Sequence, residues 1–213
     1  LVGDGDDGIV YAASRDGNVY AFKAEDGQAV WQARSDQQEA FRNPPSLGAT
    51  SLYAVDVNGL LYAFDRQTGQ RRWRSESERY VGRPSVLSAG TNEYVLVAKR
   101  DGVIEAFSAE GQSIKQWRVT DALLQNNVSV MFSFGPLIGH MGNAAVAWML
   151  DNNGIMRMLA PPSAITRVLK PSFVRNSLED AFAYGYFDTS ALPYQNQALL
   201  LDGQDRLHLI NPT

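Results

Sequence analysis

Side chains that could perform catalysis or hold a metal ion are few in this chain of 213 residues. The segment DGDDG at residues 4–8 brings the carboxylates of Asp4, Asp6 and Asp7 together, as a calcium-binding loop would. A loop of the EF-hand type, however, needs oxygen ligands at alternating positions and a glutamate further along, and this spacing has neither. We interpret the segment as a solvated turn, and the sequence predicts no metal site.

Catalysis by a nucleophilic side chain has equally little support. The chain contains no cysteine, which excludes disulfides, thiolate nucleophiles and cysteine-ligated zinc. Its two histidines are His140 and His208, and His140 has no serine or cysteine nucleophile close to it in the sequence. Every acidic side chain is expected at a turn or on a solvated edge. The sequence therefore predicts no catalytic residue and no enzymatic activity.

Composition and charge exclude two further classes of protein. Apolar residues make up 45% of the chain and charged residues 20%, which is typical of a globular domain. The net charge is −4 with no block of like charges, so we expect no binding to nucleic acid. The longest fully apolar run, Ala144–Leu150, is too short to span a bilayer, so no transmembrane segment is predicted in this chain.

An internal repeat organises the chain. Asp-Gly or Asn-Gly pairs end at Gly17, Gly59, Gly102 and Gly154, and each pair lies between two short apolar runs, which is the strongest short signal for a β-hairpin. A further apolar run precedes each hairpin and another follows it. We name the four expected strands a, b, c and d in chain order. Four strands in a unit of about 42 residues are typical of one blade of a β-propeller.

The sequence therefore predicts an all-β fold, a β-propeller of four-stranded antiparallel blades with about five blades present. The predicted blades are residues 1–35, 44–75, 83–119, 134–170 and 183–213. The last blade is expected to be incomplete because no run for a strand d follows its hairpin. A closed propeller needs its last blade completed, so residues 1–213 are expected to be a single segment of a larger propeller.

Tryptophan recurs once in each of the first three blades. Trp31, Trp73 and Trp117 stand at equivalent places after the turn glycines. A single ligand would not need the same residue in three blades, so these side chains are interpreted as structural and packed between neighbouring blades. The fourth blade has Val168 at this place and a Pro-Pro pair at 161–162 in place of the Thr-Gly turn, so it is a degenerate copy.

The segment Ala63–Trp73, AFDRQTGQRRW, resembles the tryptophan-docking repeat of PQQ-type propellers. Ala21–Trp31 matches the same pattern with Lys23 and Asp26 at the Asp and Thr positions, and Ala106–Trp117 matches it more loosely. Two groups share this repeat: the quinoprotein dehydrogenases, and the non-catalytic branch typified by BamB, the lipoprotein propeller of the bacterial outer-membrane β-barrel assembly machinery. The enzymes also carry calcium and a disulfide of adjacent cysteines at the quinone, and this chain has no cysteine.

The resemblance to the BamB-like branch implies a non-enzymatic scaffold of the bacterial cell envelope that has no cofactor and binds another protein of the assembly machinery. It implies location in the periplasm, with an anchor to the outer membrane through a lipid on an N-terminus that this sequence lacks. Two alternatives stay open. One is a fragment of a PQQ-dependent quinoprotein dehydrogenase, and the other is a ligand-sensing propeller domain of a signalling protein.

The connections from strand d to the next strand a are the longest loops, and they mix charged with aromatic side chains. In a propeller they emerge on the same face as the b–c turns, and long loops on a rigid scaffold are where binding usually occurs. Arginine and aromatic residues are also the side chains that interface hot spots favour. The predicted partner-binding residues are Arg34, Phe41, Arg42, Arg79, Tyr80, Arg83 and Leu123. The alternative that the aromatic residues only pin each loop to its blade stays open.

Overall fold

The computed structural model of the chain describes a defined set of residues: 2–4, 8–76, 79–89, 91–118, 131–132, 134–141, 144–150, 156–159, 165–169, 192–194, 197–201 and 207–210. All helix and strand structure in these residues is β-strand. Every pair of neighbouring strands in a sheet is antiparallel, and each strand pairs with its neighbours in the sequence. The all-β class predicted from the sequence is therefore confirmed.

Five sheets follow one another along the chain, and we refer to them as the first to the fifth blade. The first contains β1 (Val2–Asp4), β2 (Ile9–Ala13), β3 (Asn18–Lys23) and β4 (Ala29–Arg34). The second contains β5 (Ser46–Leu47), β6 (Ser51–Val55), β7 (Leu61–Asp65) and β8 (Arg71–Arg74). The third contains β9 (Tyr80–Ala89), β10 (Asn92–Lys99), β11 (Val103–Ser108) and β12 (Ser113–Arg118).

The two remaining blades are described less completely. The fourth contains β13 (Leu137–Met141), β14 (Ala144–Leu150), β15 (Met156–Leu159) and β16 (Ile165–Leu169). The fifth contains β17 (Leu192–Tyr194), β18 (Gln197–Leu201) and β19 (Leu207–Ile210). The predicted turn at Gly154 and the predicted Pro-Pro turn at 161–162 lie outside the described residues.

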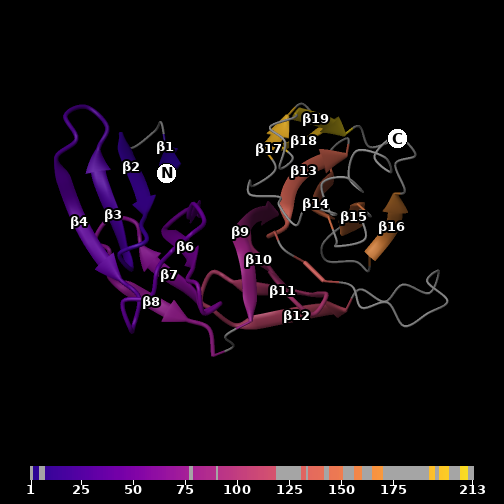
Figure 1. Cartoon of the computed structure of the whole chain (residues 1–213), viewed down its shortest axis with the longest axis horizontal. Coiled ribbons are helices and arrows are strands. Elements are labelled where there is room, and N and C mark those ends of the chain that lie inside the picture. Colours follow the sequence, from indigo (N-terminus) through magenta and orange to yellow (C-terminus); the bar gives the residue numbers. More distant parts are fainter. Residues whose placement is uncertain are drawn as a thin grey trace.

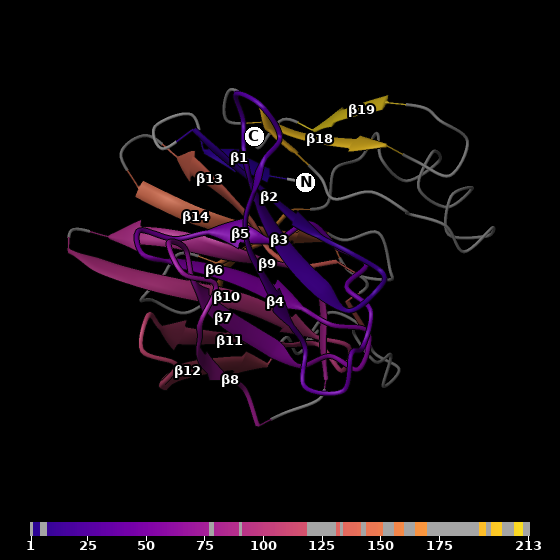
Figure 2. The same cartoon turned by 90° about the vertical axis from the view of Figure 1, so that its left-hand side faces the viewer.

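The blades are arranged as in a propeller. Figure 1 shows them in chain order, from the indigo first blade on the left to the orange fourth and yellow fifth blades on the right. The first strands of successive blades contact each other: β1 contacts β5, β5 contacts β9, β9 contacts β13, and β13 contacts β17. Figure 2, turned by 90°, shows the first blade in front with the later blades behind it. Strand a is therefore the inner strand of each blade, and the propeller prediction is confirmed.

Two repeated backbone features explain the repeated sequence. Gly59 at the β6–β7 hairpin turn has a φ of +84°, a conformation that a residue with a Cβ rarely adopts. The pairing of strand c with strand d shifts register at the Ala-Phe dipeptide in each of the first three blades, at Ala21/Phe22, Ala63/Phe64 and Ala106/Phe107. A β-bulge thus recurs at the same place in these three blades.

The hydrophobic core lies in the seams between blades. The first seam, between the first and second blades, buries Tyr11, Val19, Phe41, Leu52, Tyr62 and Phe64. The second seam buries Tyr53, Val55, Leu61, Tyr80, Val95, Val97 and Phe107. The third seam buries Leu87, Leu96, Ile104, Trp117, Phe132 and Met149. Both faces of β6 and β7 are buried because a blade on each side covers them.

Candidate functional site

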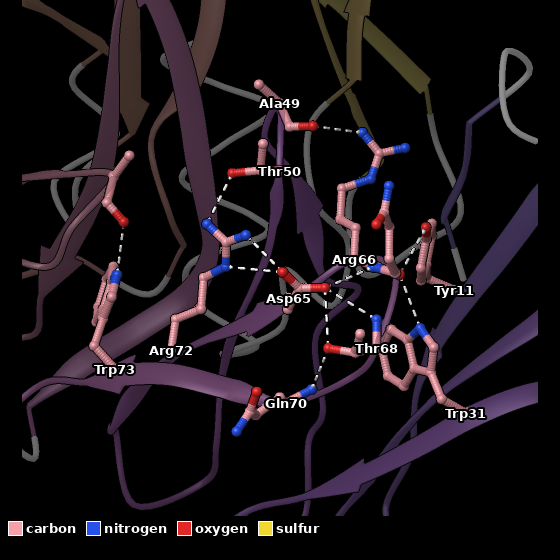
Figure 3. Close-up of polar contacts among 12 residues, drawn as sticks. Tyr11, Trp31, Ala49, Thr50, Asp65, Arg66, Thr68, Gln70, Arg72 and Trp73 are labelled. Carbon is pink, nitrogen blue, oxygen red and sulfur yellow. Dashed lines mark hydrogen bonds and ion pairs between the residues drawn. The ribbon is translucent and has the colours of Figure 1, made fainter.

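Trp31 locks the first blade onto the second. Its indole Nε1 donates a hydrogen bond of 2.8 Å to the carbonyl oxygen of Arg66, in the turn between β7 and β8 (Figure 3). The ring lies directly over Gly69, where a Cβ atom would stand 2.6 Å from the Cε3 atom of Trp31. Tyr11 packs against the indole with ring centroids 5.8 Å apart. This turn therefore needs glycine both for its φ of +72° and for the space that the indole occupies.

Trp73 repeats this arrangement one blade further on. Its Nε1 donates a hydrogen bond of 2.8 Å to the carbonyl oxygen of Ala109, and its ring lies over Gly111. The rings of Tyr53 and Phe107 pack against the indole, each with its centroid 5.8 Å from that of Trp73. Two successive seams are thus closed by the same tryptophan, carbonyl and glycine combination.

Asp65 holds the turn that receives Trp31. Its Oδ1 accepts hydrogen bonds from the backbone N–H groups of Gln67 and Thr68 and from the Thr68 hydroxyl, all at 3.0 Å (Figure 3). The Arg72 guanidinium donates to Oδ2 through Nη2 at 2.6 Å and Nε at 3.2 Å. The bonds from Arg72 and Thr68 lower the pKa of Asp65 to about 2. The Asp and Thr of the repeat therefore shape the turn rather than bind a ligand.

Trp117 occupies the equivalent place in the third blade but makes a different contact. Its side chain is buried among the apolar residues of the third seam, and its exposed fraction is 8%. Its Nε1 has no hydrogen-bond partner within the described part of the chain. The third seam therefore rests on apolar packing without the indole-to-carbonyl bond of the first two.

The b–c turns and the d–a connections meet on one side of the blades, as the sequence predicts, and we call this surface the loop face. In the described residues it consists of 14–17, 34–45, 56–59, 75–76, 79, 99–102, 131–132 and 134–136. Backbone hydrogen bonds join each connection to a hairpin turn, from the N–H groups of Phe41, Tyr80 and Phe132 to the carbonyls of Ser14, Gly59 and Arg100. The loops are thus fixed to the blades that they connect.

Three of the predicted partner-binding residues are exposed on the loop face. Arg34 stands at the end of β4, and Arg42 and Arg79 lie in the connections that enter the second and third blades. Leu123 lies outside the described residues. A role in partner binding stays a prediction for all four.

Phe41 and Tyr80 are buried, with exposed fractions of 1% and 4%, so the expectation that they are presented to a partner is wrong. Phe41 meets the ring of Tyr62 edge to face, and Tyr80 meets Phe107 in the same way. Each ring fills a seam between two blades because the connection that carries it crosses that seam. A sequence signal was present: Phe41, Tyr80 and Phe132 each stand four residues before a proline of the next predicted strand a.

Arg83 is half-buried and belongs to the inner strands. Its Nε donates a hydrogen bond of 2.8 Å to the Ser46 hydroxyl, which itself donates to the carbonyl oxygen of Pro84. The Ser85 hydroxyl makes the equivalent contact with the carbonyl oxygen of Pro136 in the next blade. Burial lowers the pKa of the Arg83 guanidinium. The inner strands of three successive blades are therefore linked by serine hydroxyl groups.

Glu105 is a buried acid that the sequence analysis missed, and the expectation that every acid lies at a turn or a solvated edge is wrong. Its carboxylate pairs with Lys99 at 2.7 Å and accepts hydrogen bonds from Tyr80, Ser113 and Gln116. Burial alone would raise the pKa of Glu105, but these four donors outweigh it and lower the pKa. The signal was an acidic residue where the first two blades have a tyrosine.

A family model described as "Outer membrane protein assembly factor BamB" matches residues 2–147. The chain belongs to this family. The matched range holds the first three blades, β13 and the first part of β14, and so it includes both indole-locked seams. No curated protein matches the sequence significantly.

Solved structures show the same fold. BamB from Moraxella catarrhalis superposes with a TM-score of 0.65 at 17% sequence identity, over 98% of this chain and 56% of that protein. The computationally designed Ika8 protein gives a TM-score of 0.60 at 14% identity, over 98% of this chain and 57% of the other. The quinohemoprotein alcohol dehydrogenase from Comamonas testosteroni gives 0.57 at 15% identity, over 76% and 34%. This BamB-family chain thus spans little more than half the length of the first two.

The acidic side chains of the described residues are spread over several blades. Among them, no group of three or more His, Cys, Asp or Glu side chains is placed to hold a metal ion. The buried carboxylates of Asp56 and Glu105 are engaged by internal donors, Asp56 by Tyr62 and the Leu60 N–H.

The described part of the chain also contains no helix long and apolar enough to cross a membrane.

Proposed function

We propose that this BamB-family chain is a non-enzymatic scaffold that binds another protein of the outer-membrane assembly machinery through its loop face. The observation that carries the proposal is the match of the family model over residues 2–147. The loop face supports it because exposed arginines are displayed there on connections that buried aromatic rings hold in place. Rigid loops lose little conformational freedom on binding.

The proposal includes location in the bacterial periplasm, where an assembly factor for outer-membrane proteins would meet its substrates. It also includes the absence of enzymatic activity and of a bound cofactor. The absence of cysteine supports this part, since the dehydrogenases that share the repeat are expected to carry a disulfide at the quinone.

Photo-crosslinking in the source bacterium tests the scaffold role. A photoreactive amino acid replaces Val57 or Met131, which are exposed apolar residues of the loop face. As controls it replaces Val30 or Ile114, which are equally exposed but lie on the outer strands β4 and β12. We expect crosslinks to an outer-membrane assembly component, identified by mass spectrometry, from the loop-face positions only. Equal crosslinking from all four positions, or none to that machinery, would contradict the proposal.

A second candidate, a quinoprotein dehydrogenase fragment, is favoured by the structural similarity to the Comamonas enzyme. Purified protein is incubated with PQQ and calcium, freed of unbound quinone, and assayed for dye-linked alcohol oxidation. The scaffold proposal expects neither retained quinone nor oxidation. Stoichiometric retention of PQQ together with alcohol oxidation would replace the scaffold by the enzyme.

A further inference from the structure

Gln38, on the loop face, has an unusual backbone conformation. It is the one non-glycine residue with a positive φ, +59°, in the part of the chain that the structure describes. A side chain makes this left-handed conformation unfavourable, and glutamine is not among the residues that adopt it readily. Glycine at this position would avoid the cost. The chain therefore gives up some stability and keeps a side chain at residue 38.

Contacts with the first blade hold the backbone around Gln38 in place. The Ser35 N–H donates a hydrogen bond of 3.0 Å to the carbonyl oxygen of Gly17, and the Ser35 hydroxyl donates one of 3.0 Å to the carbonyl oxygen of Glu39. Gln38 itself lies over the β2–β3 hairpin turn, because a Cβ atom on Gly17 would stand 2.4 Å from the carbonyl oxygen of Gln38. The left-handed conformation is therefore fixed by packing.

The second blade fixes the start of the same connection. The Asp36 carboxylate pairs with Arg74 at 2.7 Å and also with Arg71, and both arginines belong to β8. The Asp36 N–H donates a hydrogen bond of 3.4 Å to the Tyr62 hydroxyl. The connection is thus anchored on two blades, and the residue at its tip, Gln38, is already positioned for a contact.

The side chain of Gln38 makes no polar contact inside the described chain. Gln37 and Gln38 are both exposed, and neither carboxamide has a hydrogen-bond partner among the described residues. The unfavourable backbone conformation therefore has no compensating bond from the side chain that causes it. Backbone strain of this kind occurs at functional positions, where it is part of how a binding group is presented.

The charges of the loop face favour no charged ligand, because acidic and basic side chains are equally frequent in its described residues. The acids are Asp16, Asp36, Glu39, Asp56, Glu76 and Asp101, and the bases are Arg15, Arg34, Arg42, Arg79, Lys99 and Arg100. A neutral group is the better match for such a surface. A carboxamide both donates and accepts hydrogen bonds, so it complements a peptide group, whose carbonyl accepts and whose N–H donates.

We propose that Gln38 contacts the partner protein and that its carboxamide pairs with the backbone of an extended segment of that partner. The inference rests on the proposed function and names the chemistry that the loop face recognises. The segment is extended because a helix satisfies its own peptide groups. Val57 lies near this contact, since its N–H donates a hydrogen bond of 2.9 Å to the carbonyl oxygen of Ala40, two residues from Gln38.

Substitutions at residue 38 separate the side chain from the backbone. Gln38→Gly removes the strain and the carboxamide together, whereas Gln38→Ala removes the carboxamide and keeps the strain. The matched control is Gln67→Ala, because Gln67 is also exposed but lies in the β7–β8 turn on the opposite side of the blades. In urea denaturation of the purified chain, we expect Gln38→Gly to raise the midpoint and both alanine variants to change it little.

Binding is measured in the source bacterium as the yield of crosslinks from a photoreactive residue at position 57 to the assembly machinery. We expect Gln38→Gly and Gln38→Ala to lower this yield about threefold or more, since each loses the hydrogen bonds of the carboxamide, and Gln67→Ala to leave it unchanged. Gln38→Glu should lower the yield as the alanine variant does, because a carboxylate cannot donate to a peptide carbonyl.

Three outcomes would overturn the inference: no rise of the urea midpoint in Gln38→Gly, equal losses of crosslinking in Gln38→Ala and Gln67→Ala, or stronger crosslinking in Gln38→Glu, which would indicate a cationic group on the partner. The proposed function is separable from it. If crosslinks from position 57 persist undiminished in Gln38→Ala, the scaffold role stands and the contact through Gln38 fails.

Discussion

Alanine substitutions at two glycines with the same backbone conformation can distinguish the cost of displacing a docked tryptophan from the cost of backbone strain. Gly27 and Gly69 occupy the turn between strands c and d in the first and second blades, and both have a φ of +72°. A Cβ atom on Gly69 would lie 2.6 Å from the Trp31 ring, whereas one on Gly27 would meet nothing within 4 Å. Alanine at the two positions therefore introduces the same strain but only one steric clash.

The magnitudes follow from these contacts. The left-handed conformation costs an alanine about 1–2 kcal/mol at either position. At Gly69 the indole must also move, which adds an overpacking cost of about 1–3 kcal/mol. The displacement also weakens the hydrogen bond of Trp31 to the Arg66 carbonyl, which contributes about 1 kcal/mol. We expect Gly69→Ala to lower the free energy of unfolding by about 2–4 kcal/mol more than Gly27→Ala.

Urea denaturation followed by far-ultraviolet circular dichroism measures this difference without depending on tryptophan emission. The same two substitutions are then made in a Trp31→Leu background, where the clash is absent. In that background we expect Gly69→Ala to lower the free energy of unfolding only as much as Gly27→Ala does, because removing the indole removes its coupling to residue 69. Equal losses in the wild-type background, or an unchanged difference in the Trp31→Leu background, would refute the docking argument.

Two further predictions concern the second and third seams. Trp73→Phe should lower the free energy of unfolding by about 2–4 kcal/mol more than Trp117→Phe, because it leaves the Ala109 carbonyl without its donor, whereas Trp117→Phe removes a buried N–H that has no partner among the described residues. Equal losses in urea denaturation would contradict this. Glu105→Gln should destabilise the chain because it leaves the largely covered Lys99 without its counter-ion, and the same change at exposed Glu110 should not. The folded pKa of Glu105 lies below the ordinary 4.5. The stabilisation that ionised Glu105 gives the fold is therefore complete above that pH and is lost as the pH falls through the folded pKa. A Glu105→Gln variant whose stability depends on acid pH as the wild type does would contradict the assignment.

The fold could be predicted from the sequence because the sequence features that specify it are local. A glycine at a hairpin turn and the Ala-Phe dipeptide at a bulge each fix the backbone within a few residues, and they recur in every well-preserved blade. The start of the third blade was less readable. The prediction began it at residue 83, whereas β9 begins at Tyr80, which pairs with Lys99.

The candidate site could be predicted only in part, because the burial of a loop side chain depends on its contacts with a second blade, which the local sequence does not specify. Phe41 and Arg42 are neighbours in one connection, yet the first fills a seam and the second is exposed. Glu105 escaped notice for a related reason. Its donors Tyr80 and Lys99 come from β9 and the end of β10, which only the folded blade brings to it.

The locks between blades lie beneath the loop face, and this arrangement links stability to the proposed binding. The first two seams are each closed by an indole-to-carbonyl bond, from Trp31 and Trp73. Beyond the third blade the indole of Trp117 has no such bond among the described residues, and Leu137 stands where the two preceding inner strands have the donor serine. The loop face lies mostly on the three blades that these locks join. A surface that must present its side chains in a fixed pattern benefits from rigid seams beneath it, because each group that is already positioned loses less freedom on binding. The variant Gly69→Ala should therefore weaken the crosslinks from Val57 to the assembly machinery as well as lower stability, and Gly27→Ala should change those crosslinks little. If Gly69→Ala gives crosslinks as strong as the wild type at a temperature where it is fully folded, seam rigidity and partner binding are independent.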